Sequence, residues 1–71
     1  MKLNYYPETD SLYIDLSEKP SVDSREIAED IVVDFDSEGH VAGLDIQHAS
    51  KNLVLDTLET VSFPVKRLKV A

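Results

Sequence analysis

The sequence predicts an α+β domain: a small antiparallel β-sheet meander of four or five strands, with one C-terminal helix packed on one face. Apolar and polar residues alternate in several short runs between turn-forming residues, as they do in strands that bury one face. A later segment has apolar residues at the spacing i, i+4 and i+7, which is typical of a helix lying on a sheet. We expect strands that are consecutive in the chain to be neighbours in the sheet.

The most strongly patterned stretch is Ile31–Gln47, which we interpret as the central hairpin. Its first half, Ile31–Phe35, is rich in β-branched and aromatic residues, and its second half has an apolar residue at every second position. The turn Asp36–Gly39 ends in a glycine, which can adopt the positive φ that such a loop needs. Gly43 lies inside the second strand, where a glycine indicates a bulge or a close approach to the backbone.

Three further strands are expected before this hairpin. Lys2–Tyr6 alternates between apolar and polar residues, and the turn residues Pro7–Asp10 connect it to a second alternating run, Leu12–Leu16. These two runs therefore predict another hairpin. Val22–Glu29 has little apolar content, so we expect an exposed edge strand, where charged side chains discourage aggregation between sheets.

The segment that follows the central hairpin is the only candidate for a cover on the sheet. We expect a helix that begins at Lys51, with Ser50 as its N-cap. Its apolar stripe would consist of Val54, Leu58 and Val61, widened by Leu53 and Leu55. Residues 53–63 also fit a period of two, so a strand is the alternative interpretation of the same segment.

Pro64 disfavours helical geometry at the preceding residue and ends whichever element comes before it. We therefore expect one α+β domain over residues 1–63 and a basic and apolar C-terminal tail over residues 64–71. The tail contains three of the seven basic residues of the chain, Lys66, Arg67 and Lys69. It could dock on the acidic body or on a second copy of the chain, and a frayed chain end is the simpler alternative.

The charge balance favours a basic partner and argues against direct nucleic-acid binding. The net charge is −7, and residues 1–65 contain four basic and fourteen acidic side chains, a balance of −10. Such a surface repels phosphate backbones, although it would also serve simply to keep a small domain soluble. The chain has no cysteine and no apolar run of membrane-spanning length, so we expect a cytoplasmic protein without a membrane partner.

One stretch resembles a metal site. The residues from Asp34 to His40 place acids at positions one, three and five and glycine at position six of a calcium-loop pattern, with Asp45 at position twelve. Calcium loops of that kind are flanked by helices, whereas this stretch is flanked by predicted strands, and a hairpin turn needs the same residue types. The weak metal candidates are Asp34, Asp36, Glu38 and Asp45.

The sequence contains no pattern typical of an enzyme. His40 and His48 are the only imidazoles, no serine lies in a Gly-x-Ser-x-Gly turn, and a small sheet offers little concavity for a buried site. We therefore expect no catalytic residue and no cofactor, and an enzyme would need a partner chain to complete its site. Asp15, Asp34 and Asp45 are solvated residues on strand faces, and they are our candidates for binding a partner protein.

Three ordered runs, Tyr6–Ser17, Ile31–Ile46 and Ala49–Ser50, resemble a bacterial family of proteins of unknown function, numbered 2283. The family pattern is Tyr-Asp-Pro-Glu-x-Asp-x-Leu-Tyr-Ile, then an apolar strand, Asp/Glu-Gly, Val-Gly-Ile-Glu-Ile and Ala-Ser. Tyr6 stands here where the family usually has an acidic residue, and the likeness ends near Leu53. The resemblance implies a small antiparallel sheet with a helix and without known catalytic residues.

Genes of this family often lie beside those of small basic proteins that resemble ribonuclease-like toxins, so the resemblance also implies an antitoxin role. We therefore expect a non-enzymatic interaction module, acting as an antitoxin that neutralises such a toxin, and a homodimer. The alternative is a domain that binds a small ligand or a divalent metal through the turn from Asp34 to His40.

Overall fold

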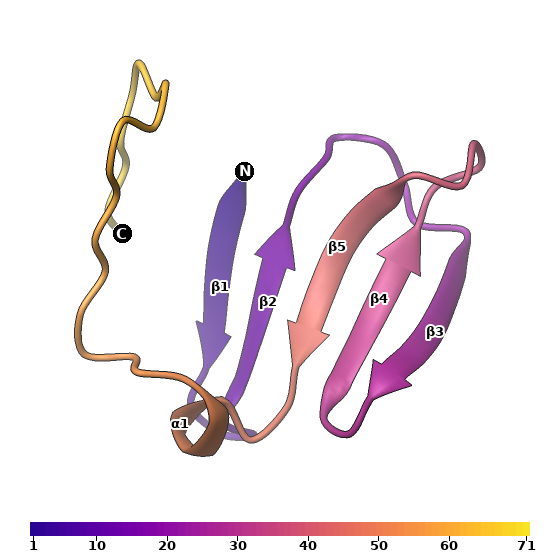
Figure 1. Ribbon diagram of the computed structural model, residues 1–71, viewed down its shortest axis with the longest axis horizontal. Coiled ribbons are helices and arrows are strands. Elements are labelled where there is room, and N and C mark those ends of the chain that lie inside the picture. Colours follow the sequence, from indigo (N-terminus) through magenta and orange to yellow (C-terminus); the bar gives the residue numbers. More distant parts are fainter.

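The computed structural model contains five strands followed by one short helix. The strands are β1 (Lys2–Tyr6), β2 (Ser11–Asp15), β3 (Asp23–Ala28), β4 (Ile31–Phe35) and β5 (Val41–Ile46), and the helix is α1 (Ala49–Asn52). All five strands form a single antiparallel sheet (Figure 1). The predicted antiparallel sheet is therefore confirmed, and so is each expected hairpin.

The order of the strands differs from the predicted meander. The sheet runs β1-β2-β5-β4-β3, so β5 lies between β2 and β4, and the connection from β2 to β3 passes the ends of β5 and β4 (Figure 1). A meander would place β3 in the middle of the sheet, where its charged side chains would have neighbours on both sides. In the observed order β3 is an exposed edge strand, as its composition predicts, and the apolar β5 is central.

One face of the sheet is apolar, because the register places aliphatic side chains opposite one another. The first apolar row contains Leu3, Ile14, Leu44 and Val33, and the next contains Tyr5, Leu12, Ile46 and Ile31. Burial is nevertheless limited, and the buried apolar residues are Val33, Ala42, Ile46 and Ala49. The sheet therefore has an apolar surface that no second layer of this chain covers fully.

The turn between β4 and β5 is built as the sequence predicts. Gly39 has a φ of 82°, and its amide donates a hydrogen bond to the carbonyl oxygen of Asp36. The Asp36 carboxylate is only 4% exposed, and its Oδ1 accepts hydrogen bonds of 2.9 Å from the amides of Glu38 and His40. Both hydrogen bonds hold the pKa of Asp36 below its ordinary value, and the bond from the His40 amide has the larger effect.

A single C-terminal helix follows the sheet as predicted, but it is shorter than expected and does not cover a face of the sheet. α1 has four residues, and Leu53 ends it in an extended conformation, with φ of −132° and ψ of 154°. Ser50 is not its N-cap: that position belongs to His48, and Ser50 instead donates hydrogen bonds to Asp10. β-branched residues such as Thr57 and Val61 lower the helix propensity of the segment that follows.

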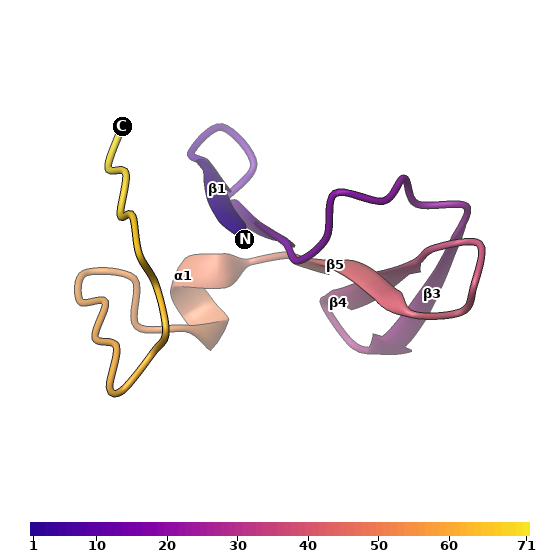
Figure 2. The same ribbon diagram turned by 90° about the horizontal axis from the view of Figure 1, so that it is seen from above.

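Residues Leu53–Ala71, which we call the arm, contain no helix or strand, and all of them are exposed. At the start of the arm the exposed fraction alternates, with 37% at Leu53, 79% at Val54 and 40% at Leu55. This is the two-residue period of an extended chain, although the arm pairs with no strand. In both views the arm lies beyond β1, so it does not cover the half of the sheet made by β3, β4 and β5 (Figure 1, Figure 2).

Two turn aspartates fix α1 against one end of the sheet. Asp10 accepts hydrogen bonds from the Ser50 amide at 3.1 Å and the Ser50 hydroxyl at 2.6 Å, and Asp30 lies 3.0 Å from Nδ1 of His48 and 3.2 Å from Nδ2 of Asn52. The bond from Ser50 lowers the pKa of Asp10, and the bond to His48 lowers that of Asp30. Asp10, Asp30 and His48 all adopt positive φ, which brings the two hairpin turns and the start of α1 together.

Candidate functional site

The second face of the sheet is polar and gathers the acidic residues of four strands. Its two central rows are Glu26, Val32, Asp45, Tyr13 and Asn4, and Ser24, Asp34, Gly43, Asp15 and Lys2. Asp15, Asp34 and Asp45, the three candidates for partner binding, therefore lie on one face, although they come from three different strands. The strand order is responsible, because β5 places Asp45 between β2 and β4.

Tyr13 occupies the centre of this polar face. Its hydroxyl donates a hydrogen bond of 2.7 Å to Oδ2 of Asp34, and Oδ1 of the same carboxylate accepts one of 2.6 Å from the Ser24 hydroxyl. To reach from β2 to β4, the phenol must pass over β5. It does so at Gly43, where a Cβ atom would lie 2.6 Å from Cζ of Tyr13. The close approach predicted at Gly43 is therefore confirmed, and the pairing also shifts there, as in a bulge.

The carboxylates around Tyr13 give this face a negative potential. The hydrogen bond to Asp34, together with partial burial and the charges of Asp34, Asp15 and Asp45, raises the pKa of Tyr13 to about 12. The phenol therefore stays protonated and remains a hydrogen-bond donor at neutral pH. The ion pairs between lysine or arginine and a carboxylate lie elsewhere, at Lys19–Glu38 and Arg25–Asp23, and leave the charge of this face in place.

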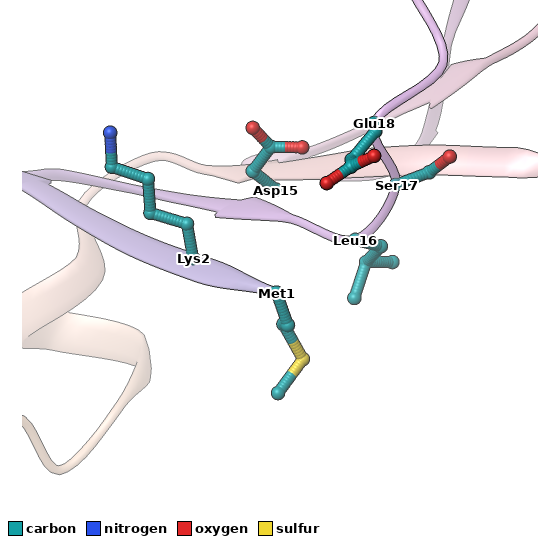
Figure 3. A pocket seen from close by; sticks show the side chains of 6 residues that line it. All are labelled: Met1, Lys2, Asp15, Leu16, Ser17 and Glu18. Atoms are coloured by element: carbon teal, nitrogen blue, oxygen red, sulfur yellow. The ribbon is translucent and has the colours of Figure 1, made fainter. Parts of the chain in front are cut away.

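A shallow hollow of about 290 Å³ lies at the end of the sheet where β1 begins and β2 ends (Figure 3). Its lining consists of Met1, Lys2, Asp15, Leu16, Ser17 and Glu18. Figure 3 shows the side chains of Lys2 and Asp15 on one side of the β1–β2 ribbon and those of Met1 and Leu16 on the other. Small-molecule sites are usually deeper and mostly apolar, whereas this hollow is open and four of its six lining residues are polar.

The weak metal candidates do not converge on a common point. Asp34 is engaged by Tyr13 and Ser24, Asp36 is turned into its own loop, and Glu38 forms an ion pair of 3.0 Å with Lys19. No three His, Cys, Asp or Glu side chains of the chain lie close enough together to hold a metal ion. The geometry thus gives Asp36 a clear role in closing the turn between β4 and β5.

The family model for proteins of unknown function, DUF2283, matches residues 2–50. The chain belongs to the DUF2283 family. The match covers all five strands and the first two residues of α1, so the family region of this DUF2283 chain includes both faces of the sheet and ends just before the arm. A comparison with curated proteins and with solved structures finds no match. No helix of the structure is long and apolar enough to cross a membrane.

The sequence alone did not reveal that Tyr13 lies at the centre of the polar face. The alternation of residues places Tyr13 and Asp15 on one side of their strand and Gly43 and Asp45 on one side of theirs. Only the pairing of β2 with β5 shows that these two sides form the same surface. A glycine opposite an acidic residue, and diagonal to a tyrosine on the neighbouring strand, is the signal that would have located the Tyr13–Asp34 bond.

Proposed function

We propose that this DUF2283 chain is a non-enzymatic binding module whose polar sheet face holds a small basic protein, as an antitoxin neutralises a basic, ribonuclease-like toxin. The gathering of Asp15, Asp34 and Asp45 on one face is the observation that supports this proposal. Glu26 adds a fourth acid to the two polar rows, in which Lys2 is the only basic residue.

Such a face is suited to electrostatic recognition. The carboxylates project from strands, so their spacing is fixed before the partner arrives and little conformational freedom is lost on binding. The surplus of negative charge over residues 1–65 adds a long-range attraction that accelerates encounter with a basic surface. The antitoxin form of the proposal depends on the gene arrangement known for the family, and the acidic face supplies the surface that this role requires.

The test is the affinity of the purified chain for the product of the neighbouring gene, measured by calorimetry at two salt concentrations. The double variant Asp15→Asn/Asp45→Asn removes two charges from the polar face but keeps the Tyr13–Asp34 bond. We expect it to weaken binding by about tenfold or more and to reduce the salt dependence. The matched control Glu8→Gln/Glu29→Gln removes two charges from exposed turn residues and should change the affinity much less.

Co-expression supplies the functional readout. The wild-type chain and the control should restore the growth of cells that produce the neighbouring protein, whereas the variant of the polar face should restore it less. Absence of binding and of growth rescue, or an equal loss of affinity in the two double variants, would contradict the proposal.

A further inference from the structure

The chain exposes more surface than its size requires. A compact monomer of 8.0 kDa is expected to have an accessible surface of about 4,450 Å². The observed surface is 6027 Å², which is an excess of about 1,600 Å². Part of this excess belongs to the apolar face, where Leu3 and Tyr5 remain nearly half exposed, and part belongs to the arm.

The arm and the apolar face together line an open groove. This groove has a volume of about 380 Å³ and is lined by Leu3, Tyr5, Leu12 and Ile14 of the sheet and by residues of the segment Leu53–Leu58. Leu58 and Val54 turn most of their surface to solvent, with exposed fractions of 72% and 79%. An apolar groove of this kind, continuous with an uncovered sheet face, is typical of an interaction surface.

We propose that the apolar face and the arm form a homodimer interface, in which a second copy of this chain covers the face and each arm lies against the partner. If each copy buries its excess surface of about 1,600 Å², the interface covers about 3,200 Å² in total. This area is within the range of obligate homodimers. A second copy fits an interface of this size, and the basic end of the arm, with Lys66, Arg67 and Lys69, offsets part of the repulsion between two chains of net charge −7.

This dimer leaves the acidic faces free, because they lie on the other side of each sheet. It does not depend on the function proposed above, and the two can fail separately. A symmetric pair would present Asp15, Asp34 and Asp45 twice, on opposite outer surfaces. One dimer could then hold two basic proteins.

The mass of the full chain in solution, measured by light scattering and sedimentation, tests the proposal. We expect a particle of twice 8.0 kDa. Leu58→Glu should raise the dissociation constant of the dimer by about thirtyfold or more, because it places a charge in the lining of the apolar groove. Val22→Glu is the matched control, since Val22 is 63% exposed and lies in the loop between β2 and β3, and it should leave the dimer intact.

Amide hydrogen exchange then locates the interface. Residues of the arm should exchange more slowly in the wild-type dimer than in the Leu58→Glu monomer, while the edge strand β3 should exchange equally in both. A wild-type mass of 8.0 kDa at every soluble concentration would overturn the proposal. An open-ended assembly, or a dimer that resists Leu58→Glu and protects β1 or β3 in place of the arm, would overturn it as well.

Discussion

Gly43 determines where the Tyr13 phenol lies, and Tyr13 in turn orients the carboxylate of Asp34. Any side chain at position 43 would occupy the space through which the phenol passes, and the carbonyl oxygen of Ile14, 3.2 Å from the site of a Cβ atom, would also have to move. The polar face therefore depends on one residue that has no side chain. The same glycine lies between Asp15 and Asp34 in the sheet, and the phenol fills the space above it on the way to Asp34.

We expect Gly43→Ala to break the Tyr13–Asp34 bond and to shift the pKa of Tyr13 from about 12 toward the ordinary value of 10.0. Loss of a hydrogen bond to a charged group costs about 1.5–3 kcal/mol, while alanine in a strand is favoured over glycine by about 0.5–1 kcal/mol. The variant should therefore lose about 1 kcal/mol of stability. Urea unfolding at neutral pH measures the loss, and the ultraviolet absorbance of tyrosinate measures the pKa.

Unfolding at alkaline pH tests the same hydrogen bond, because the direction of the stability change is fixed by the raised pKa of Tyr13. Because the pKa of Tyr13 is raised on folding, its bond stabilises the wild-type chain fully below pH 10.0, and this contribution disappears as the pH rises toward about 12. The stability difference between wild type and Gly43→Ala should therefore shrink over that interval. Tyr13→Phe serves as the control that assigns the titration among the three tyrosines. A Gly43→Ala chain in which Tyr13 still ionises near pH 12 would show that the phenol does not need the glycine.

At the scale of elements, local pattern predicted the strands and a helix after them, but not the order of the strands or the length of the helix. Each strand was visible because alternation and turn residues are properties of neighbouring residues, and Gly39 and Asp36 mark their turn by chemistry alone. The order β2-β5-β4 depends on which strands are apolar enough to have neighbours on both sides. Predicting it requires the apolar content of every strand to be compared with that of the others. The predicted N-cap was wrong because His48, with its positive φ, precedes the helix and Ser50 donates its hydrogen bonds to Asp10, and no periodicity reports either contact.

The strand order can be tested with cysteine pairs, because the chain has no cysteine of its own. Tyr13 on β2 lies directly opposite Asp45 on β5, so the pair Tyr13→Cys/Asp45→Cys should form a disulfide under mild oxidation. The control pair Tyr13→Cys/Glu26→Cys joins β2 to β3 on the same face. In the observed order these strands are three positions apart, about 14 Å, so no disulfide should form within a chain. A meander would reverse both results, which gel mobility and mass spectrometry would detect.

At the scale of the whole molecule, one face of the sheet is apolar and the other is acidic. We therefore propose a different partner for each face. The apolar face is not fully covered, because the arm lies beyond β1 and forms no second layer over it (Figure 2). The acidic face carries charges that keep it hydrated. A sheet of this kind can be stabilised on one side by a second copy and remain available on the other, so assembly and recognition need not compete.

Stability should therefore depend on protein concentration. Dissociation accompanies unfolding of a dimer, so each tenfold rise in concentration adds about 1.4 kcal/mol per dimer, which corresponds to an increase of about 4 °C in Tm. We expect this increase in wild type and in Asp15→Asn/Asp45→Asn, because the acidic face is outside the interface. Leu58→Glu should show a lower Tm, and the concentration dependence should disappear below its raised dissociation constant. Calorimetric scans over two decades of concentration provide the measurement. A Tm that stays constant in wild type, or that loses its dependence when the acidic face is neutralised, would mean that the two faces do not have the separate roles assigned to them.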